Sequence, residues 1–303
     1  MVNNSTTPEE LDSFDFAEIK PRTSEWKRFR RVFFAKGAVI FGLVILVALF
    51  ITAIFAPQLA PYDPYKPYAG PSLAQPSAQH WLGTDKLGRD TLSRLIYGSR
   101  VAIEVGFISV AVGSVLGIFL GLLAGYTGGA TYAVIMRAMD AFMCFPMLIL
   151  ALVVAAVLGS GISNVIIALS IAVIPGYARV TCGLVLSLKE NDYILAQRSL
   201  GAGKLRIMLR HLLPNAFPPL IVLVTMQLGA LILAEAGLSF IGIGIKPPGA
   251  AWGAMVNDGY QYLLKNPVLS FAPGLAIMLV VFAFNIVGDG LRDALDPRMR
   301  GLI

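Results

Sequence analysis

The chain has 303 residues, of which 56% are hydrophobic and only 14% are charged. This apolar share exceeds that of an ordinary soluble domain, so the composition excludes one and predicts a membrane protein. The net charge of +6 is accounted for by topology and by contact with lipid head groups, and nothing in its distribution calls for nucleic acid.

Residues 1–36 form a leader that begins acidic and ends in a basic cluster. We expect it to be cytoplasmic, and disordered as far as the basic cluster because it is polar. The first apolar run, residues 37–56, is about twice as long as the core of a secretory signal peptide. It therefore predicts a retained transmembrane helix.

Six uncharged runs are long enough to cross a hydrocarbon layer of ~30 Å as helices. Each run is a continuous apolar block rather than a short alternation, which indicates helices and not barrel strands. The fold class is therefore an all-α membrane protein with six transmembrane helices. The runs divide the chain into an external segment (57–100), a core with five spans (101–290) and a cytoplasmic tail (291–303). The predicted spans are 37–56, 105–126, 141–159, 162–178, 216–234 and 268–288.

The orientation follows from the placement of lysine and arginine. With the amino terminus inside, 17 of these residues lie on the inner side and 7 on the outer side. The positive-inside rule then predicts that the amino and carboxyl termini are both cytoplasmic. Five of the outer charges fall in segment 57–100, which at more than 40 residues is long enough for the rule to be weak.

The second span contains four glycines at four-residue intervals, Gly113, Gly117, Gly121 and Gly125. Such a ridge lets another helix approach closely. We interpret it as a helix-packing surface without a transport role. The contact could lie within this chain or against a partner, and the sequence does not choose between them.

Several ionisable residues lie near the ends of spans. Arg100 and Glu104 are four residues apart and Arg137 and Asp140 are three apart, so each pair is predicted to share a helix face and to neutralise itself in part. Arg179 has no obvious local partner, and we expect its side chain to extend to the cytoplasmic surface.

The stretch DYILAQRSLGAGKLRIMLRHLLPN interrupts the apolar runs between the fourth and fifth spans. It predicts a short helix at 192–200, a break at 201–203 and a second helix at 204–213 that Pro214 closes. Glycine at the break suits a left-handed turn. Either the lipid interface or a groove on a cytoplasmic protein could cover the apolar face of the second helix, and the break favours the protein. That face comprises Leu205, Met208, Leu209, Leu212 and Leu213.

The outer segment 237–267 is rich in glycine and proline and carries several aromatic residues. Irregular backbone at membrane depth persists only where protein or water covers it. From the residues alone, its aromatic side chains fit an interfacial aromatic belt. Glu235, near the outer end of the fifth span, is the candidate for a pore-facing charge.

The sequence lacks the residue sets that chemistry would require. Cys144 and Cys182 are predicted to be buried packing residues, and His80 and His211 lack companion metal ligands. The segment GAGKL fails the phosphate-loop pattern at both ends. We therefore expect no catalytic residue, no metal and no cofactor bound by this chain.

The glycine-broken stretch resembles the "EAA" loop of permease subunits of bacterial ATP-binding-cassette importers. In that pattern Glu-Ala-Ala is followed by three residues, Gly, nine residues, Ile, one residue and Leu-Pro. Ala196, Gly201, Leu213 and Pro214 match at the correct spacing. The chain departs from the pattern at Leu195, Gln197 and His211.

Four other stretches are similar to the C-type permease subunit of dipeptide/oligopeptide importers. They are HWLGTDKLGRDTLSRLIYGSR, IMRAMDAFMCFP, GLSFIGIGIKPPGAAWGAM and FNIVGDGLRDALDPRMR. The resemblance covers nearly everything after the leader. It implies a type I importer permease fold in the bacterial inner membrane and a heterodimer with a homologous permease. It also implies two cytoplasmic ATPase subunits that use ATP and Mg, and an external substrate-binding protein.

By the same resemblance, segment 190–214 couples to the ATPases, and 237–267 is where the external protein docks and the pore is gated. Phe240 and Trp252 are the aromatic candidates for pore or gating roles, with the aromatic belt as the alternative. The coupling residues would be Ala196, Gly201, Ala202, Leu205, Leu213 and Pro214. Peptides are the expected substrates, with glutathione, nickel complexes, opines and oligosaccharides as alternatives. A secondary transporter is less favoured, because the six spans show no internal duplication.

Overall fold

The computed structural model describes residues 25–295, so residues 1–24 of the predicted leader and 296–303 of the predicted tail lie outside the described part. Apart from one isolated β-bridge, between Thr84 and Asp90, the regular structure of the described residues is helical. The helices are α1 (Glu25–Phe33), α2 (Gly37–Ile54), α3 (Ala56–Leu59), α4 (Thr91–Thr127), α5 (Gly129–Met143), α6 (Met147–Leu158), α7 (Ile162–Leu188), α8 (Asp192–Ser199), α9 (Lys204–Ile207), a π-helical turn (Met208–Leu212), α10 (Leu213–Ile241), α11 (Trp252–Tyr260) and α12 (Val268–Leu295).

Within residues 25–295, five helical stretches are long and apolar enough to cross a membrane, and a sixth crossing results if the bent pair α5–α6 counts as one. The third predicted span, 141–159, is not one continuous helix, since α5 and α6 meet at 90° around Pro146. Proline lacks a backbone N–H and restricts the residue before it, so it ends the helix there. With 12 residues, α6 is about 18 Å long and cannot cross the bilayer alone.

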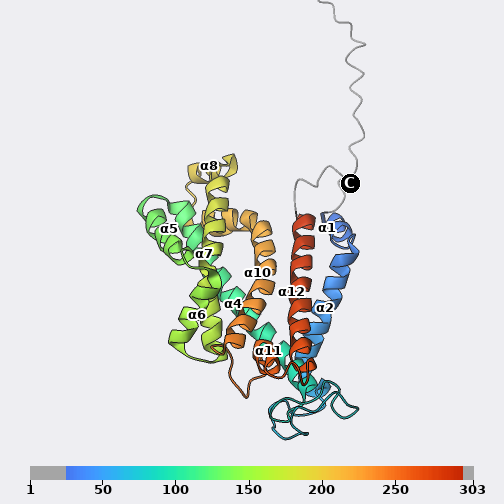
Figure 1. Cartoon of the computed structure of the whole chain (residues 1–303). Coiled ribbons are helices and arrows are strands. Elements are labelled where there is room, and N and C mark those ends of the chain that lie inside the picture. Colours follow the sequence, from blue (N-terminus) through green and yellow to red (C-terminus); the bar gives the residue numbers. More distant parts are fainter. Residues whose placement is uncertain (1–24, 296–303) are drawn as a thin grey trace, which may run out of the picture.

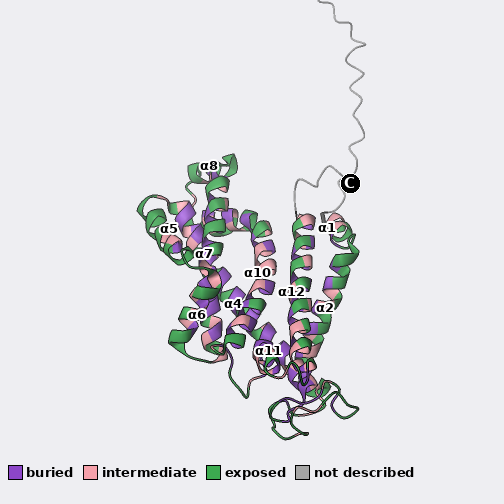
Figure 2. Ribbon diagram, viewed as in Figure 1, coloured by how far each residue is buried: buried purple, intermediate pink, exposed green. Residues whose placement is uncertain are grey.

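The helices stand roughly alongside one another, with α2 packed against α12 and α4 against α7 (Figure 1). The first and last described residues lie at the same end as α8, whereas α11 and the irregular segment before α4 lie at the other end. Lys36, just before α2, bonds Asp293 of α12 at 2.5 Å, and this hydrogen bond raises the pKa of the Lys36 ammonium. The outer faces of α2 and α6 are exposed (Figure 2), as at Val44 and Val157, which is typical of helices in contact with lipid.

The glycine ridge of α4 packs against α7 of the same chain. At Gly113, Gly117, Gly121 and Gly125 an added Cβ would come within 3.0 Å of an atom of α7. The sequence left open whether the ridge meets this chain or a partner, and the structure assigns it to this chain. The ridge is therefore no contact surface for a second permease.

Three predicted boundaries are corrected by the helices. α4 begins at Thr91, ten residues before the predicted core, because the carboxylate of Asp90 accepts the Ser93 N–H at 2.8 Å and caps the helix. Pro214 does not close the preceding helix, since it occupies the first turn of α10, where no N–H is needed. At the carboxyl end α12 runs to Leu295, beyond the predicted limit of 290.

Candidate functional site: a coupling surface and a transmembrane cavity

A tight turn joins α8 to α9. The Ala202 N–H donates to the Gln197 carbonyl at 3.0 Å, and the Gly201 N–H donates to the Arg198 carbonyl at 2.9 Å. These two bonds are the Schellman arrangement, in which the residue after the cap takes a left-handed conformation. Gly201 has φ +76°, which confirms the predicted left-handed turn.

The turn is anchored to the membrane helices by a small core of its own. A second contact reinforces this core, because the Arg198 guanidinium lies over the ring of Tyr126 at the end of α4, 5.4 Å from the ring centre. Such an anchor fixes the direction in which the two short helices point. The buried residues of this core are Leu122 of α4, Val185 of α7, Ile194 of α8, Ile207 of α9 and Leu212 of the π-helical turn.

The predicted apolar face of residues 204–213 is divided in two. Leu212 is fully buried in the small core, whereas Leu205 and Leu209 are 63% and 51% exposed. Leu200, in the turn itself, is 80% exposed. We call Leu200, Leu205 and Leu209 the leucine surface. It lies at the end of the molecule away from α11 (Figure 1) and is flanked by exposed Lys204, Arg206 and Arg210.

The other predicted coupling residues surround this surface. Ala196 and Pro214 are exposed, Ala202 packs against the small core and Leu213 is half-buried. The structure thus brings all six predicted coupling residues to one end of the molecule.

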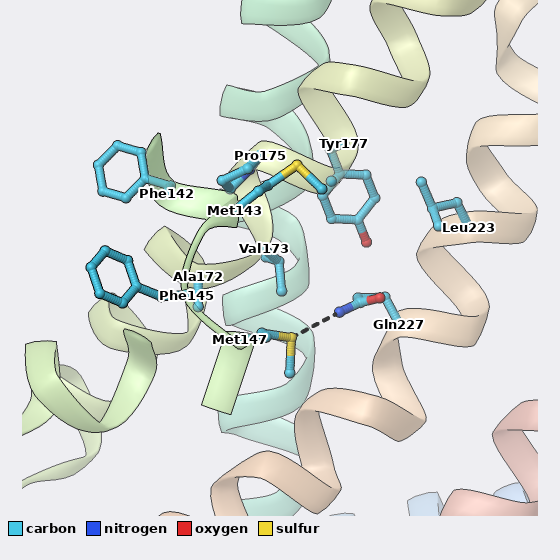
Figure 3. Close-up of a pocket in the computed structure, with 11 residues that line it drawn as sticks. Phe142, Met143, Phe145, Met147, Ala172, Val173, Pro175, Tyr177, Leu223 and Gln227 are labelled. Carbon is cyan, nitrogen blue, oxygen red and sulfur yellow. Dashed lines mark hydrogen bonds between the residues drawn. The ribbon is translucent and has the colours of Figure 1, made fainter. Parts of the chain in front are cut away.

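A cavity of about 220 Å³ lies between the α5–α6 break, the middle of α7 and the middle of α10. Figure 3 shows Met147, Tyr177 and Gln227 facing it from three different helices. The Gln227 amide donates to the Met147 sulfur at 3.5 Å. The sequence analysis missed this site, although Pro146 and Pro175 mark the two helix interruptions beside it.

The predicted pore-facing role of Glu235 is wrong. Its side chain is buried between helices and accepts a 2.7 Å hydrogen bond from the Ser239 hydroxyl one turn further along α10. Ser239 in turn accepts the Ile245 N–H at 3.2 Å, which ties the end of α10 to the following loop. Glu235 therefore helps to fix this end of the chain.

The two aromatic candidates lie in different environments. Trp252 is 4% exposed and donates its indole N–H to the Leu95 carbonyl at 2.9 Å, so its side chain does not face a pore, and its gating role stays a prediction. Its ring lies where a side chain on Gly98 of α4 would be, which makes it a packing residue between α4 and α11. Phe240 is 41% exposed at the end of α10 and stays a candidate for gating or docking.

A buried charge cluster at the start of α4 accounts for most of the positive charges in the predicted external segment 57–100. Asp85 bonds the buried Arg89 guanidinium at 2.7 Å and lies 3.6 Å from that of Arg94. Lys86 pairs with Asp258 of α11 at 2.7 Å. Three of the five cations counted in this segment are thus paired with carboxylates.

Asp140 has a different partner from the one predicted. It pairs with Arg179, which joins α5 to α7, so the predicted pairing with Arg137 is wrong. Arg179 has no local partner, as expected, and its partner lies on another helix. Within residues 25–295 Arg100 forms no ion pair with Glu104, and its guanidinium lies over the Tyr97 ring instead.

The two cysteines also differ. Cys182 is buried against the glycine ridge, as predicted, whereas Cys144 is exposed at the α5–α6 break because the helix ends there. His80 contacts the Asp90 carboxylate at 2.9 Å, which places it in the cluster before α4. Among residues 25–295 no group of three or more His, Cys, Asp or Glu side chains could hold a metal ion.

Several apolar spanning helices, with an anchored turn that exposes leucines at one end, define a multi-pass membrane protein with a surface for a partner. The chain belongs to the family "Binding-protein-dependent transport system inner membrane component", which matches residues 117–301. Residues 24–79 match the "N-terminal TM domain of oligopeptide transport permease C". This chain is therefore an inner-membrane permease subunit of an ATP-binding-cassette importer, which confirms the family resemblance.

Curated relatives match almost the full length. The chain is 42% identical over 276 residues to the glutathione transport system permease protein GsiD of Pectobacterium atrosepticum, covering 91% of this chain and 90% of that protein. It is 45% identical over 277 residues to the GsiD of Escherichia coli O157:H7, with the same coverage.

Among solved structures, an inward-facing conformation of the MetNI methionine ABC transporter aligns with a TM-score of 0.55 at 22% identity. That alignment covers 68% of this chain and 97% of the transporter chain. It shows that the two chains share a fold.

Proposed function

We propose that this chain forms half of the translocation pathway of an importer for small peptides. The other half is a homologous permease, two cytoplasmic ATPase subunits supply the energy with ATP and Mg, and an external binding protein delivers the ligand. The α8 end is then cytoplasmic and the α11 end external, in agreement with the distribution of lysine and arginine. Phe240 at the external end contributes to docking or gating.

The observation that carries the coupling role is the leucine surface on an anchored turn. A helix that lies in the lipid interface needs no fixed direction relative to the spans. Here the small core fixes that direction, while Leu200 and Leu205 remain more than 60% exposed. An anchored apolar surface with basic neighbours fits a groove on an ATPase subunit that has an acidic rim.

Glutathione is the first peptide to test, because the relatives with near full-length matches carry it in their names. Di- and oligopeptides are the broader class expected for this type of subunit. A nickel complex, an opine or an oligosaccharide is the alternative substrate within the same family.

The test of this function is reconstitution of the complete importer in proteoliposomes. We expect uptake of labelled glutathione or dipeptide that requires ATP, the binding protein and both permeases. Transport by this chain alone without ATP would overturn the proposal. ATP-dependent uptake of an oligosaccharide or a nickel complex, but of no peptide, would retain the importer and overturn the substrate class.

The coupling role has its own test in a matched pair of variants. Leu205→Asp introduces a charge into the leucine surface, and Leu264→Asp makes the same change at a fully exposed leucine of the α11 end. We expect Leu205→Asp to reduce recovery of the ATPases with the permease by about tenfold or more, because loss of a buried interface anchor costs on the order of 2 kcal/mol. Leu264→Asp should leave recovery unchanged. Equal recovery in both variants would favour the lipid interface.

A further inference from the structure

The cavity beside the α5–α6 break lies at mid-membrane depth. Tyr177 is near the middle of α7 (Ile162–Leu188), and Gln227 is at the middle of α10 (Leu213–Ile241). Both helices qualify as membrane spans, so their midpoints lie far from either head-group layer.

Two interruptions of helical hydrogen bonding border the cavity. Pro175 inside α7 has no N–H to donate to the preceding turn, and Pro146 follows the end of α5. Backbone groups freed at membrane depth are tolerated only where protein or water covers them. Gly176, between Pro175 and Tyr177, has nothing within 4 Å of where a Cβ would be, which leaves room at this point.

Two polar side chains face this space with unused hydrogen-bonding capacity. The Tyr177 hydroxyl is buried without a partner, and Tyr177 is only 2% exposed. Figure 3 shows it directed toward the space between Leu223 and Gln227. The amide nitrogen of Gln227 has only the weak contact with the Met147 sulfur. A buried hydroxyl without a partner is costly, which points to a partner that is supplied from outside this chain.

The rest of the cavity wall is apolar and uncharged. It consists of thioether, aromatic and aliphatic groups such as Met143, Phe145 and Val173. Methionine and aromatic walls adapt to apolar side chains of different shape. A volume of about 220 Å³ is below the ~300–1,000 Å³ typical of pockets that enclose a drug-sized ligand. The cavity therefore fits one part of a ligand.

We propose that this cavity is a subsite for a peptide in transit, in which Tyr177 and Gln227 bond one backbone amide while the Met and Phe wall takes the neighbouring uncharged side chain. A carboxamide offers one acceptor and two donors, which matches the acceptor and donor of a peptide group. This inference rests on the proposed transport of peptides. It assigns Tyr177 and Gln227 to binding of the peptide group, and the apolar wall to the preference for uncharged side chains, downstream of delivery by the binding protein.

The test uses the complete importer in proteoliposomes, with variants that remove only polar groups. Tyr177→Phe deletes the hydroxyl, and Gln227→Leu replaces the carboxamide by an apolar group of similar size. The controls are Tyr132→Phe and Gln58→Leu, which make the same changes at exposed positions outside the cavity. Uptake of dialanine, dileucine and diaspartate is measured together with ATP hydrolysis stimulated by the loaded binding protein.

We expect Tyr177→Phe and Gln227→Leu to lower uptake of dileucine about 3- to 10-fold, the range for loss of one hydrogen bond, with a smaller effect on diaspartate. Stimulated ATP hydrolysis should change less than twofold, and both controls should behave as the wild type. Unchanged uptake of all three peptides in both variants would overturn the subsite, with a lipid chain as the occupant. An equal fall for all peptides, with reduced recovery of the second permease, would make a partner side chain the occupant. Failure of the wild type to import glutathione and all three of these peptides would instead overturn the proposed function.

Discussion

The turn between α8 and α9 offers a matched pair of substitutions two residues apart. Gly201 has φ +76° and Gly203 has φ −65°, and a Cβ at either position would have nothing within 4 Å. Alanine therefore adds the same atom in the same open space at both positions. Only the backbone conformation distinguishes them.

Gly201→Ala should strain the turn by about 1–2 kcal/mol, because a Cβ clashes with the backbone in the left-handed region. That cost shifts the equilibrium away from the observed turn by about 5- to 30-fold. Gly203→Ala should be close to neutral, since its backbone suits any residue and the entropy lost by the unfolded chain offsets the poorer capping of α9 by alanine. Gly201→Asn should lie between wild type and alanine, because asparagine tolerates this conformation better.

The assay is recovery of ATPase subunits with affinity-purified permease, normalised to permease in the membrane. We expect a clear loss with Gly201→Ala, partial retention with Gly201→Asn and full retention with Gly203→Ala. Equal recovery for the two alanine variants would refute the reasoning, since it would mean that the direction of α9 has no influence on ATPase binding.

Three further changes test the rest of the structure. Gly121→Ala should destabilise the detergent-solubilised protein by about 1–3 kcal/mol, because the added methyl group forces α4 away from α7. Gly183→Ala, at a helix position with open space, should not destabilise it. Equal thermal stability of the two variants would contradict the packing of the glycine ridge against α7. Asp85→Ala leaves two buried guanidinium groups without their carboxylate, and a cost of about 3–5 kcal/mol should lower the melting temperature. Cysteine at Leu264 but not at Ser199 should react with an impermeant thiol reagent on intact cells, and the reverse pattern would invert the orientation.

The spans were predictable because their length and apolar character are set locally. The break in the third span was not, since residues 141–159 are apolar on both sides of Pro146 and composition alone cannot show a 90° bend. Helix spacing likewise predicted the glycine ridge but not its partner. A single helix pattern contains no information about the helix it meets.

The errors at ionisable residues have opposite causes. Sequence spacing favours partners three or four residues apart, yet Asp140 pairs with Arg179, 39 residues away on another helix. Glu235 is the converse case, because its partner Ser239 is a local one, four residues along α10, that was overlooked. The cavity residues Tyr177 and Gln227 carry no local signal, so only the packing of α7 and α10 reveals them.

The length of α4 has a mechanical consequence. Its 37 residues form one helix of about 55 Å without an internal proline, well beyond the ~30 Å of the hydrocarbon layer. One end carries Arg94 in the buried charge cluster, and the other carries Leu122 in the core beneath the coupling turn. A tilt imposed at one end of such a rod must displace the other end in the opposite direction about whatever point α7 holds fixed. The buried charge cluster and the coupling turn, at opposite ends of α4, are thus mechanically connected through one rigid helix.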